Sequence, residues 1–191
     1  MTARVAWTYQ DYAALPDDGK RYEIHDGELC EMSAPTMLHQ ILLFELAVVL
    51  RAHVRARNLG LVMVAPLDVI LIDTPSETTV LQPDIVYLDH GRLDAARMRG
   101  VEGAPTLAVE ILSPSTAVID RTRKRELYAR YGVPYLWFVD PDTRELAVHV
   151  LESGEYRLAV RVSGSEPVDL PPFTDLGLVL SSLWPQFPIR P

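Results

Sequence analysis

Two short apolar segments constrain the fold of this chain most strongly. Residues 107–112 read LAVEIL and residues 135–139 read YLWFV. Each has the length of a strand and is apolar on both faces, which is typical of central strands covered on both sides. The segment between them, residues 117–131, has helical periodicity and ends at Gly132 with Pro134 just beyond, the usual chemistry of a helix end. The pattern predicts a helix crossing over between two central strands.

The rest of the chain adds mostly antiparallel strands to this unit. The sequence RYEIHDGELCEM has alternating apolar residues around Asp26-Gly27 and predicts a hairpin. Helices are expected at 8–19 and 39–57, strands at 61–71, 84–88, 145–151 and 156–162, a loop at 74–82, and a proline-punctuated tail after 166. The order favours a mixed α/β sandwich over a Rossmann fold.

Length and composition limit the class of protein. The 191 residues, 48% of them apolar, suit one compact domain over 1–191. No continuous apolar run reaches the roughly 18 residues of a membrane span, and the N-terminus lacks the features of a signal peptide. A cytoplasmic protein without a membrane partner is therefore expected. The single cysteine, Cys30, excludes an internal disulfide and a cysteine-cluster zinc site.

The charge is acidic overall but unevenly distributed. A formal net charge of −8 argues mildly against a nucleic-acid binder. Residues 119–132, however, contain five basic and two acidic residues, a local balance of +3. The charge therefore does not exclude a nucleic-acid substrate.

Two charged residues stand where apolar residues are expected. Glu110 interrupts the 107–112 strand, where a carboxylate without a partner would cost several kcal/mol. Lys124 shares a helix face with Leu127 and Tyr128, so it should point toward the sheet. The simplest explanation is a buried Glu110–Lys124 ion pair with a purely structural role.

A third charged residue, Asp84, suggests chemistry instead. It follows Pro83 at the start of a predicted strand. If that strand neighbours residues 107–112, Asp84 and Glu110 lie at the same edge of the sheet. Two carboxylates with open positions suit Mg²⁺, or Mn²⁺ in its place, which keeps waters and takes phosphate oxygens. Lys124 could then lower the pKa of an attacking water or stabilise the charge that develops on a phosphate.

These residues resemble a known nuclease pattern. Pro83-Asp84 followed by Glu110 and a lysine is similar to the Pro-Asp…(Asp/Glu)-x-Lys, or PD-(D/E)XK, signature of restriction-endonuclease-like nucleases. The resemblance is closer to the Uma-type (Uma-two) restriction endonuclease family. It rests on several stretches that follow one another in order: RYEIHDGEL, the HQ that opens a helix, LQPDIVYL, VEILSPST, DRTRKRELYARYGVPYLWFVDP and FTDLGLVL.

The resemblance implies a fold, an activity and a site. The fold is of the α/β (α+β) class, a restriction-endonuclease-like central mixed β-sheet flanked by helices. The activity is that of a Mg²⁺- or Mn²⁺-dependent endodeoxyribonuclease, with Asp84 and Glu110 as metal ligands and Lys124 as the catalytic lysine. The sequence departs from the short signature at Leu112, where that signature has lysine; in the Uma-type pattern the lysine comes from the following helix.

Several further residues are weaker candidates for the site. Glu23, in RYEIHDGEL, matches the family and could reach the metal directly or through water. Asp120 should orient Lys124 across one helical turn, and His39 could contact the site from the start of its helix. Glu45 on the same helix is a further candidate acid. Hydroxyl groups that should cap the helix beginning near residue 117 come from Ser113, Ser115 and Thr116.

Three functions compete at this point. The first is an endonuclease that hydrolyses DNA phosphodiester bonds, for which a homodimer or higher homo-oligomer would match the symmetry of a duplex. The second is a catalytically silent binding module that keeps the nuclease fold. The third is a metal-dependent hydrolase of a non-nucleic substrate, which the net charge of −8 favours.

Overall fold

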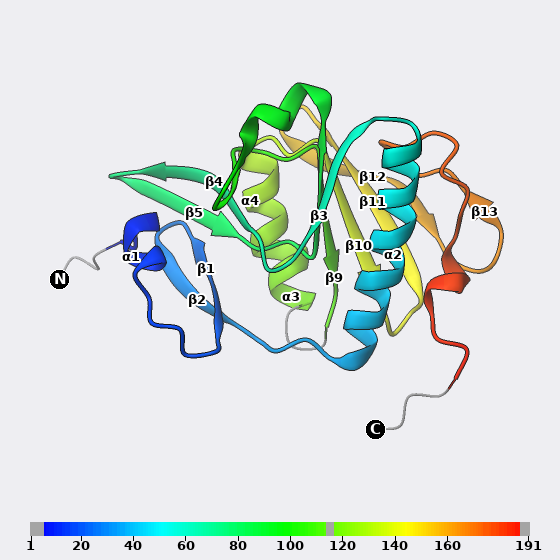
Figure 1. Ribbon diagram of the computed structural model, residues 1–191, viewed down its shortest axis with the longest axis horizontal. Helices are drawn as coiled ribbons and strands as arrows, with labels where there is room; N and C mark the ends of the chain where they lie inside the picture. The colour runs from blue at the N-terminus through cyan, green and yellow to red at the C-terminus, as the bar shows by residue number, and fades with distance from the viewer. Residues whose placement is uncertain (1–5, 114–116, 188–191) are drawn as a thin grey trace.

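The computed structural model describes residues 6–113 and 117–187, which form two six-stranded sheets and a small number of helices (Figure 1). The helical segments are α1 (Tyr9–Ala13), α2 (Met37–Ala56), η1 (His90–Ala95), α3 (Ala117–Ile119), η2 (Asp120–Lys124), α4 (Arg125–Arg130) and η3 (Leu180–Leu183). The strands are β1 (Arg21–His25), β2 (Glu28–Met32), β3 (Gly60–Val64), β4 (Asp68–Thr74), β5 (Glu77–Leu81), β6 (Ile85–Asp89), β7 (Ala96–Arg97), β8 (Gly100–Glu102), β9 (Leu107–Ile111), β10 (Tyr135–Asp140), β11 (Glu145–Glu152), β12 (Glu155–Val162), β13 (Pro167–Val168) and β14 (Leu178–Val179).

The central sheet has the strand order β12-β11-β10-β9-β6-β3. Strands β9 and β10 pair in parallel, and the other neighbours in this sheet are antiparallel. The predicted crossover is confirmed, because the helical segment 117–130 connects the two parallel strands. The expected mixed sheet flanked by helices is likewise confirmed.

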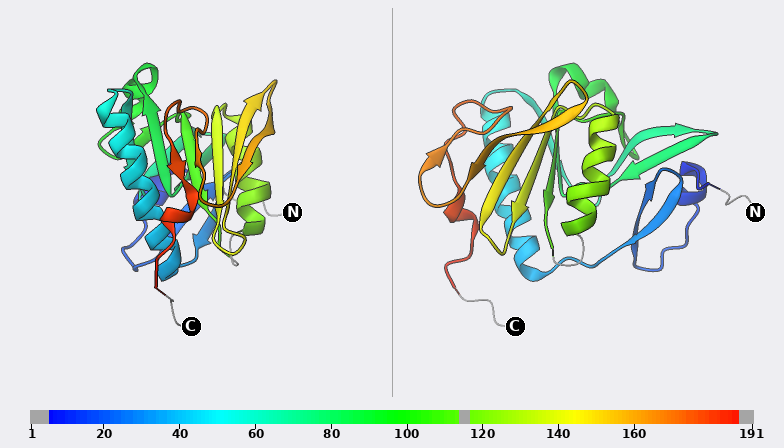
Figure 2. Two further views of the ribbon diagram at one scale, coloured as in Figure 1. Left: turned by 90° about the vertical axis from the view of Figure 1, so that its right-hand side faces the viewer. Right: turned by 180° about the vertical axis from the view of Figure 1, so that it is seen from behind.

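Helices cover both faces of this sheet. Figure 2 shows α2 on one side of the central strands and α4 on the other. The buried face of α2 packs on the sheet through Leu42, Leu46, Leu50 and Val54, against Ile85, Val109 and Trp137. On the opposite face, Leu127 and Tyr128 of α4 pack with Ala108, Leu112 and Leu136. The strands β9 and β10 are buried on both faces for this reason.

Helix α2, of 20 residues, is also long and apolar enough to cross a membrane, with a mean hydropathy of 1.5 over a window of 18 residues. The core helix of a water-soluble fold meets the same criterion, and the buried leucines of α2 face the central sheet.

The second sheet has the order β2-β1-β5-β4-β8-β7. Its β1–β2 hairpin confirms the prediction, and Asp26 and Gly27 at the turn have positive φ angles of 51° and 76°, as a tight hairpin turn requires. The expected loop at 74–82 is wrong, because β5 occupies most of it. Val80 of that strand packs with Ile24 and Ile70 in a small core of its own.

Other boundaries differ from the expected ones. The helix expected at 8–19 is only α1, which begins after a Thr8 cap that forms a capping box with Asp11. Strand β6 begins at Ile85, so Asp84 lies just before the strand. The tail after residue 166 adds the two-stranded β13–β14 pair.

The helix after β9 is interrupted by a π-helical turn at Asp120–Lys124. A continuous α-helix was the expectation, and a widened turn of this kind is often found at functional sites. Both Asp120 and Lys124 are buried within it, with exposed fractions of 3% and 1%. The predicted caps Ser115 and Thr116 lie outside the described residues.

Candidate active site

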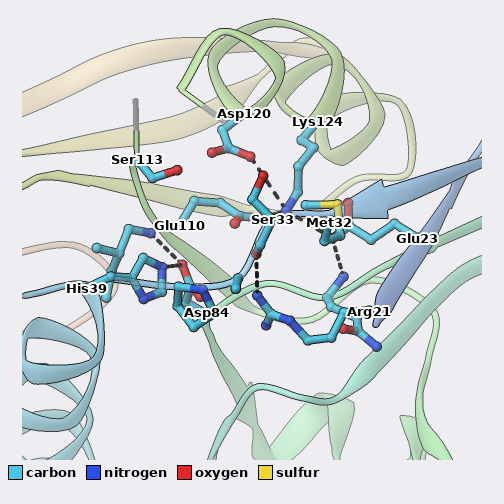
Figure 3. A pocket seen from close by; sticks show the side chains of 14 residues that line it. Arg21, Glu23, Met32, Ser33, His39, Asp84, Glu110, Ser113, Asp120 and Lys124 are labelled. Carbon is cyan, nitrogen blue, oxygen red and sulfur yellow. Dashed lines mark hydrogen bonds and ion pairs between the residues drawn. The ribbon is translucent and has the colours of Figure 1, made fainter. Parts of the chain in front are cut away.

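The candidate site lies where β9 ends and β6 begins, between the two sheets (Figure 3). Strands β6 and β9 pair with Ile85 opposite Val109 and Val86 opposite Ala108. Continuing this antiparallel register by one position places Asp84 opposite Glu110. The expected neighbourhood of the two strands is therefore confirmed. A small pocket of about 40 Å³ opens here, lined among others by Glu23, His39, Asp84, Glu110, Ser113, Asp120 and Lys124.

Asp84 is held by one of its two carboxylate oxygens. Its Oδ2 atom accepts a hydrogen bond of 2.7 Å from the backbone N–H of Ile111, and it lies 3.1 Å from Nε2 of His39. Its Oδ1 atom makes no hydrogen bond within the part of the chain that the structure describes. The His39 contact comes from the first turn of α2, so the start of that helix helps to fix the carboxylate.

Glu110 is likewise held by only one of its two carboxylate oxygens. Its Oε1 atom lies 2.6 Å from Nζ of Lys124 and accepts a 2.5 Å hydrogen bond from the Tyr128 hydroxyl. Its Oε2 atom has no hydrogen-bonding partner in residues 6–113 and 117–187. Burial raises the pKa of Glu110 well above its usual range against the attraction of Lys124, and the negative charges of Asp120 and Asp84 raise it further.

Lys124 lies at the centre of a group of carboxylates, and its predicted inward direction is confirmed. Its Nζ atom is 2.6 Å from Glu110, 3.1 Å from Oε1 of Glu23 and 3.7 Å from Oδ1 of Asp120. Burial alone would lower the pKa of Lys124, but these carboxylates, Glu110 foremost, raise it well above its usual range. The side chain is therefore a buried ammonium ion.

Glu23 reaches the pocket from β1 in the second sheet, and both of its oxygens are engaged. Oε1 accepts hydrogen bonds from the backbone N–H of Gln82 at 2.7 Å and from Lys124, while Oε2 lies 2.8 Å from Nε2 of His25. Burial opposes its ionisation, yet Lys124 and His25 hold the pKa of Glu23 at about 2. This environment suits an anchor for Lys124 better than a metal ligand.

His25 was not predicted to belong to the site. It is 4% exposed, and the ring lies behind Glu23, two positions along the same strand. Period-two alternation places both side chains on one face of β1, a signal that could have indicated the contact once Glu23 was suspected to be buried. Arg21 on the same strand also lines the pocket and was likewise missed.

The His25–Glu23 contact predicts how stability depends on pH. Burial disfavours the imidazolium ion, but hydrogen bonds with Cys30 and Glu23 raise the pKa of His25 to about 9. Because the folded-state pKa lies above the unfolded value of about 6.5, the stabilisation is complete below pH ~6.5 and is lost as pH rises through 9. We expect the free energy of unfolding to fall by about 1–3 kcal/mol over this range.

Urea unfolding from pH 6 to 9.5 would measure this loss. In the variant His25→Gln, the free energy of unfolding should depend much less on pH. The control His90→Gln, at an exposed histidine, should keep the wild-type dependence. A wild-type stability that does not change across this range would contradict the expectation.

The structure brings most of the candidate residues together and leaves one outside. Asp84, Glu110, Lys124, Glu23, Asp120 and His39 all line the pocket. Glu45 does not: it is exposed on α2 and borders a different hollow beside Trp184. The suggestion that Glu45 contributes to the site is therefore wrong. Tyr128, interpreted as core packing, is indeed buried but also donates its hydroxyl hydrogen to Glu110.

The donor set is compatible with a hard divalent cation. Asp84 and Glu110 each have one anchored oxygen and one that makes no protein hydrogen bond among the described residues. The described residues contain no group of three or more His, Cys, Asp or Glu that could hold a metal ion together. Mg²⁺ does not require three protein ligands, because it keeps several waters and is bound by one or two carboxylates plus substrate oxygens. The pocket volume of about 40 Å³ exceeds the roughly 10–15 Å³ that one water needs.

Comparisons with known proteins agree with the fold and identify the family. The family model Uma2, described as "Putative restriction endonuclease", matches residues 9–182. A crystal structure described as a putative nuclease belonging to DUF820, from Anabaena variabilis ATCC 29413, superposes with a TM-score of 0.69 at 20% sequence identity. The match covers 93% of this chain and 97% of that one. The comparison with curated proteins found no match.

Proposed function

The chain belongs to the Uma2 restriction endonuclease family, and from this premise we propose that it is a metal-dependent endonuclease that hydrolyses DNA phosphodiester bonds. The observation that carries the proposal is the meeting of Asp84, Glu110 and Lys124 in one buried pocket. Asp84 lies just before β6, Glu110 lies on β9, and Lys124 lies on the helical segment that follows β9. Charges of this kind are costly to bury, so their convergence on a water-sized pocket favours a chemical role over a structural one.

Asp84 and Glu110 would hold Mg²⁺ or Mn²⁺ through the oxygens that make no protein hydrogen bond. When bound, the cation supplies Lewis-acid polarisation of the phosphate and a lower pKa for an attacking water. The protein orients both ligands. His39 and the Ile111 N–H fix Asp84, and Tyr128 and Lys124 fix Glu110.

Lys124 would act by its charge and not as a base. Glu110 and its neighbouring carboxylates raise its pKa, so the side chain stays protonated and cannot accept a proton from water near neutral pH. A fixed ammonium group in a buried pocket can stabilise the negative charge that develops as a phosphodiester is attacked. Glu23 and Asp120 would keep the ammonium in place, and His25 would keep Glu23 ionised.

We expect the protein to cut DNA only when a divalent metal ion is present. Supercoiled plasmid incubated with purified protein and Mg²⁺ or Mn²⁺ should be nicked or linearised. Chelation with EDTA should abolish cleavage, and added Mg²⁺ should restore it, because the two carboxylates alone do not activate water. Gel electrophoresis of the plasmid measures the outcome.

Calorimetric titration with Mn²⁺ separates this proposal from its alternatives. Wild type should bind Mn²⁺, and Asp84→Ala should lose that binding. A silent titration together with an uncut plasmid would contradict the proposal and favour a binding module. Mn²⁺ binding without cleavage of any DNA would instead indicate a hydrolase of a different substrate.

A further inference from the structure

A second, larger hollow lies beside the helix that carries Lys124. It has a volume of about 490 Å³, within the size range of small-molecule sites. We call it the arginine cleft; its lining residues used below are Arg121, Arg125, Arg161, Asp140, Glu145 and His149. It adjoins the catalytic pocket: Leu112, just after β9, lines the cleft and the next residue, Ser113, lines the pocket.

The helical segment divides its charges between the two hollows. Asp120 and Lys124 line the catalytic pocket, whereas Arg121 and Arg125, each one residue later, line the cleft. The spacing of four residues keeps each pair on one side of the helix. A substrate strand held over the pocket thus has cationic groups beside it on the same helix.

The arginines of the cleft are held in place but keep most of their donors. Arg121 Nη2 lies 2.6 Å from Asp140 Oδ2, Arg161 Nη1 lies 2.8 Å from Glu145 Oε2, and Arg125 donates to the backbone oxygen of Tyr156. A guanidinium group has five N–H donors, so these contacts leave donors for an anion. Three arginines against two carboxylates leave the cleft with a positive balance in a chain whose net charge is −8.

His149 also lines the cleft and adds no charge to it. Its Nδ1 atom is buried and has no hydrogen-bonding partner within the described part of the chain. Burial and the neighbouring Arg125 lower the pKa of His149, so the ring is neutral near pH 7.

We infer that the arginine cleft binds a backbone phosphate of the nucleic-acid substrate beside the scissile position. Arg121 and Arg161 contact the phosphate, and Asp140 and Glu145 pre-orient their guanidinium groups. The cleft and the catalytic pocket are lined by consecutive residues, Leu112 and Ser113 on the chain after β9 and Arg121 and Asp120 on the helix, so the two hollows adjoin. The contacted phosphate therefore lies close to the bond that is cut on the same substrate. The inference rests on the proposed nuclease function.

Salt-dependent DNA binding tests this assignment without any cleavage. Fluorescence anisotropy with labelled duplex DNA in EDTA gives the affinity at several salt concentrations. Each lost phosphate contact lowers the slope of log affinity against log salt by about 0.9. Arg161→Gln should weaken binding several-fold and reduce the slope by about this amount, and Arg161→Lys should recover most of the slope because the charge remains.

The matched control is Arg157→Gln on the same strand, β12. Its side chain is 76% exposed and paired with Glu152 outside the cleft. Arg157→Gln removes the same charge as Arg161→Gln, but from a position outside the cleft. The slope of log affinity against log salt should therefore stay close to that of wild type. Equal effects of Arg157→Gln and Arg161→Gln on the slope would mean that the net charge of the protein, and not the cleft, determines DNA binding. That result would overturn the assignment. Inorganic phosphate can be titrated into the wild type and Arg161→Gln by calorimetry. Binding heat that is lost in Arg161→Gln, while the salt dependence of DNA binding stays unchanged, would mean that the cleft binds a free anion and would also overturn the assignment.

The cleft and the catalytic proposal fail in different ways. A wild type that cuts DNA while Arg161→Gln keeps its slope would overturn the cleft alone. A wild type that binds DNA through Arg161 but never cuts would overturn the catalytic proposal and support the cleft as a binding site. A wild type that does not bind DNA at all would overturn both.

Discussion

Replacing Glu110 by glutamine should nearly abolish DNA cleavage and yet leave the protein at least as stable as wild type. The cleavage rate should fall by about 10²–10³-fold or more, the scale expected for loss of one group that stabilises the transition state. Glutamine keeps the shape of the side chain, and its amide oxygen can still accept from Tyr128 and Lys124. It removes the charge from the group that would hold the cation.

The effect on stability follows from the surroundings of Glu110. Four carboxylates, those of Glu23, Asp84, Glu110 and Asp120, line a pocket with Lys124. Burial raises the pKa of Glu110, so its ionisation near pH 7 costs free energy in the folded state. The stability of the wild type therefore decreases as pH rises above the unfolded glutamate pKa of about 4.3, and Glu110→Gln removes this cost.

Initial rates of plasmid nicking and urea unfolding at pH 7 measure the two effects. Glu45→Gln is a matched control: it removes one glutamate charge from an exposed position outside the pocket and should change neither property. Wild-type cleavage by Glu110→Gln would remove Glu110 from the mechanism. A large loss of stability would show that its negative charge mainly holds the fold together.

The central strands could be predicted because their sequences are almost entirely apolar. Strands β9 and β10 are buried on both faces, so neither shows alternation and both stand out as apolar. The neighbourhood of Asp84 and Glu110 was also accessible, since it needed only that β6 lie beside β9. Helical periodicity then placed Lys124 on the sheet-facing side.

What the sequence could not provide depends on contacts between distant segments. Glu23 and Lys124 are 101 residues apart and meet only because the second sheet packs against the helix after β9. Strand β5 was missed because its burial comes from partners in β1 and β4, while its own residues include two threonines beside turn-forming ones. The π-helical turn has no signature in its sequence, DRTRK, which is compatible with an ordinary helix.

Replacing Lys124 by methionine should have the largest effect on stability of any single change in the site. Methionine fits the space of the apolar stem, but it removes the cation that Glu23 and Glu110 contact at 3.1 and 2.6 Å. Removing one partner of a buried ion pair leaves an uncompensated charge and costs about 3–5 kcal/mol. Cleavage should also be lost, because no ammonium group remains beside the phosphate.

A second substitution tests whether the lost stability comes from the carboxylate left without its cation. In the background of Lys124→Met, Glu110→Gln removes one of the stranded carboxylates, so it should restore part of the lost free energy of unfolding but none of the cleavage. Contacting residues are expected to show such non-additive effects of about 0.5–3 kcal/mol. Urea unfolding of the wild type, both single variants and the double variant gives the coupling directly. Strictly additive effects would mean that the two side chains do not interact, contrary to the 2.6 Å contact on which the proposed site depends.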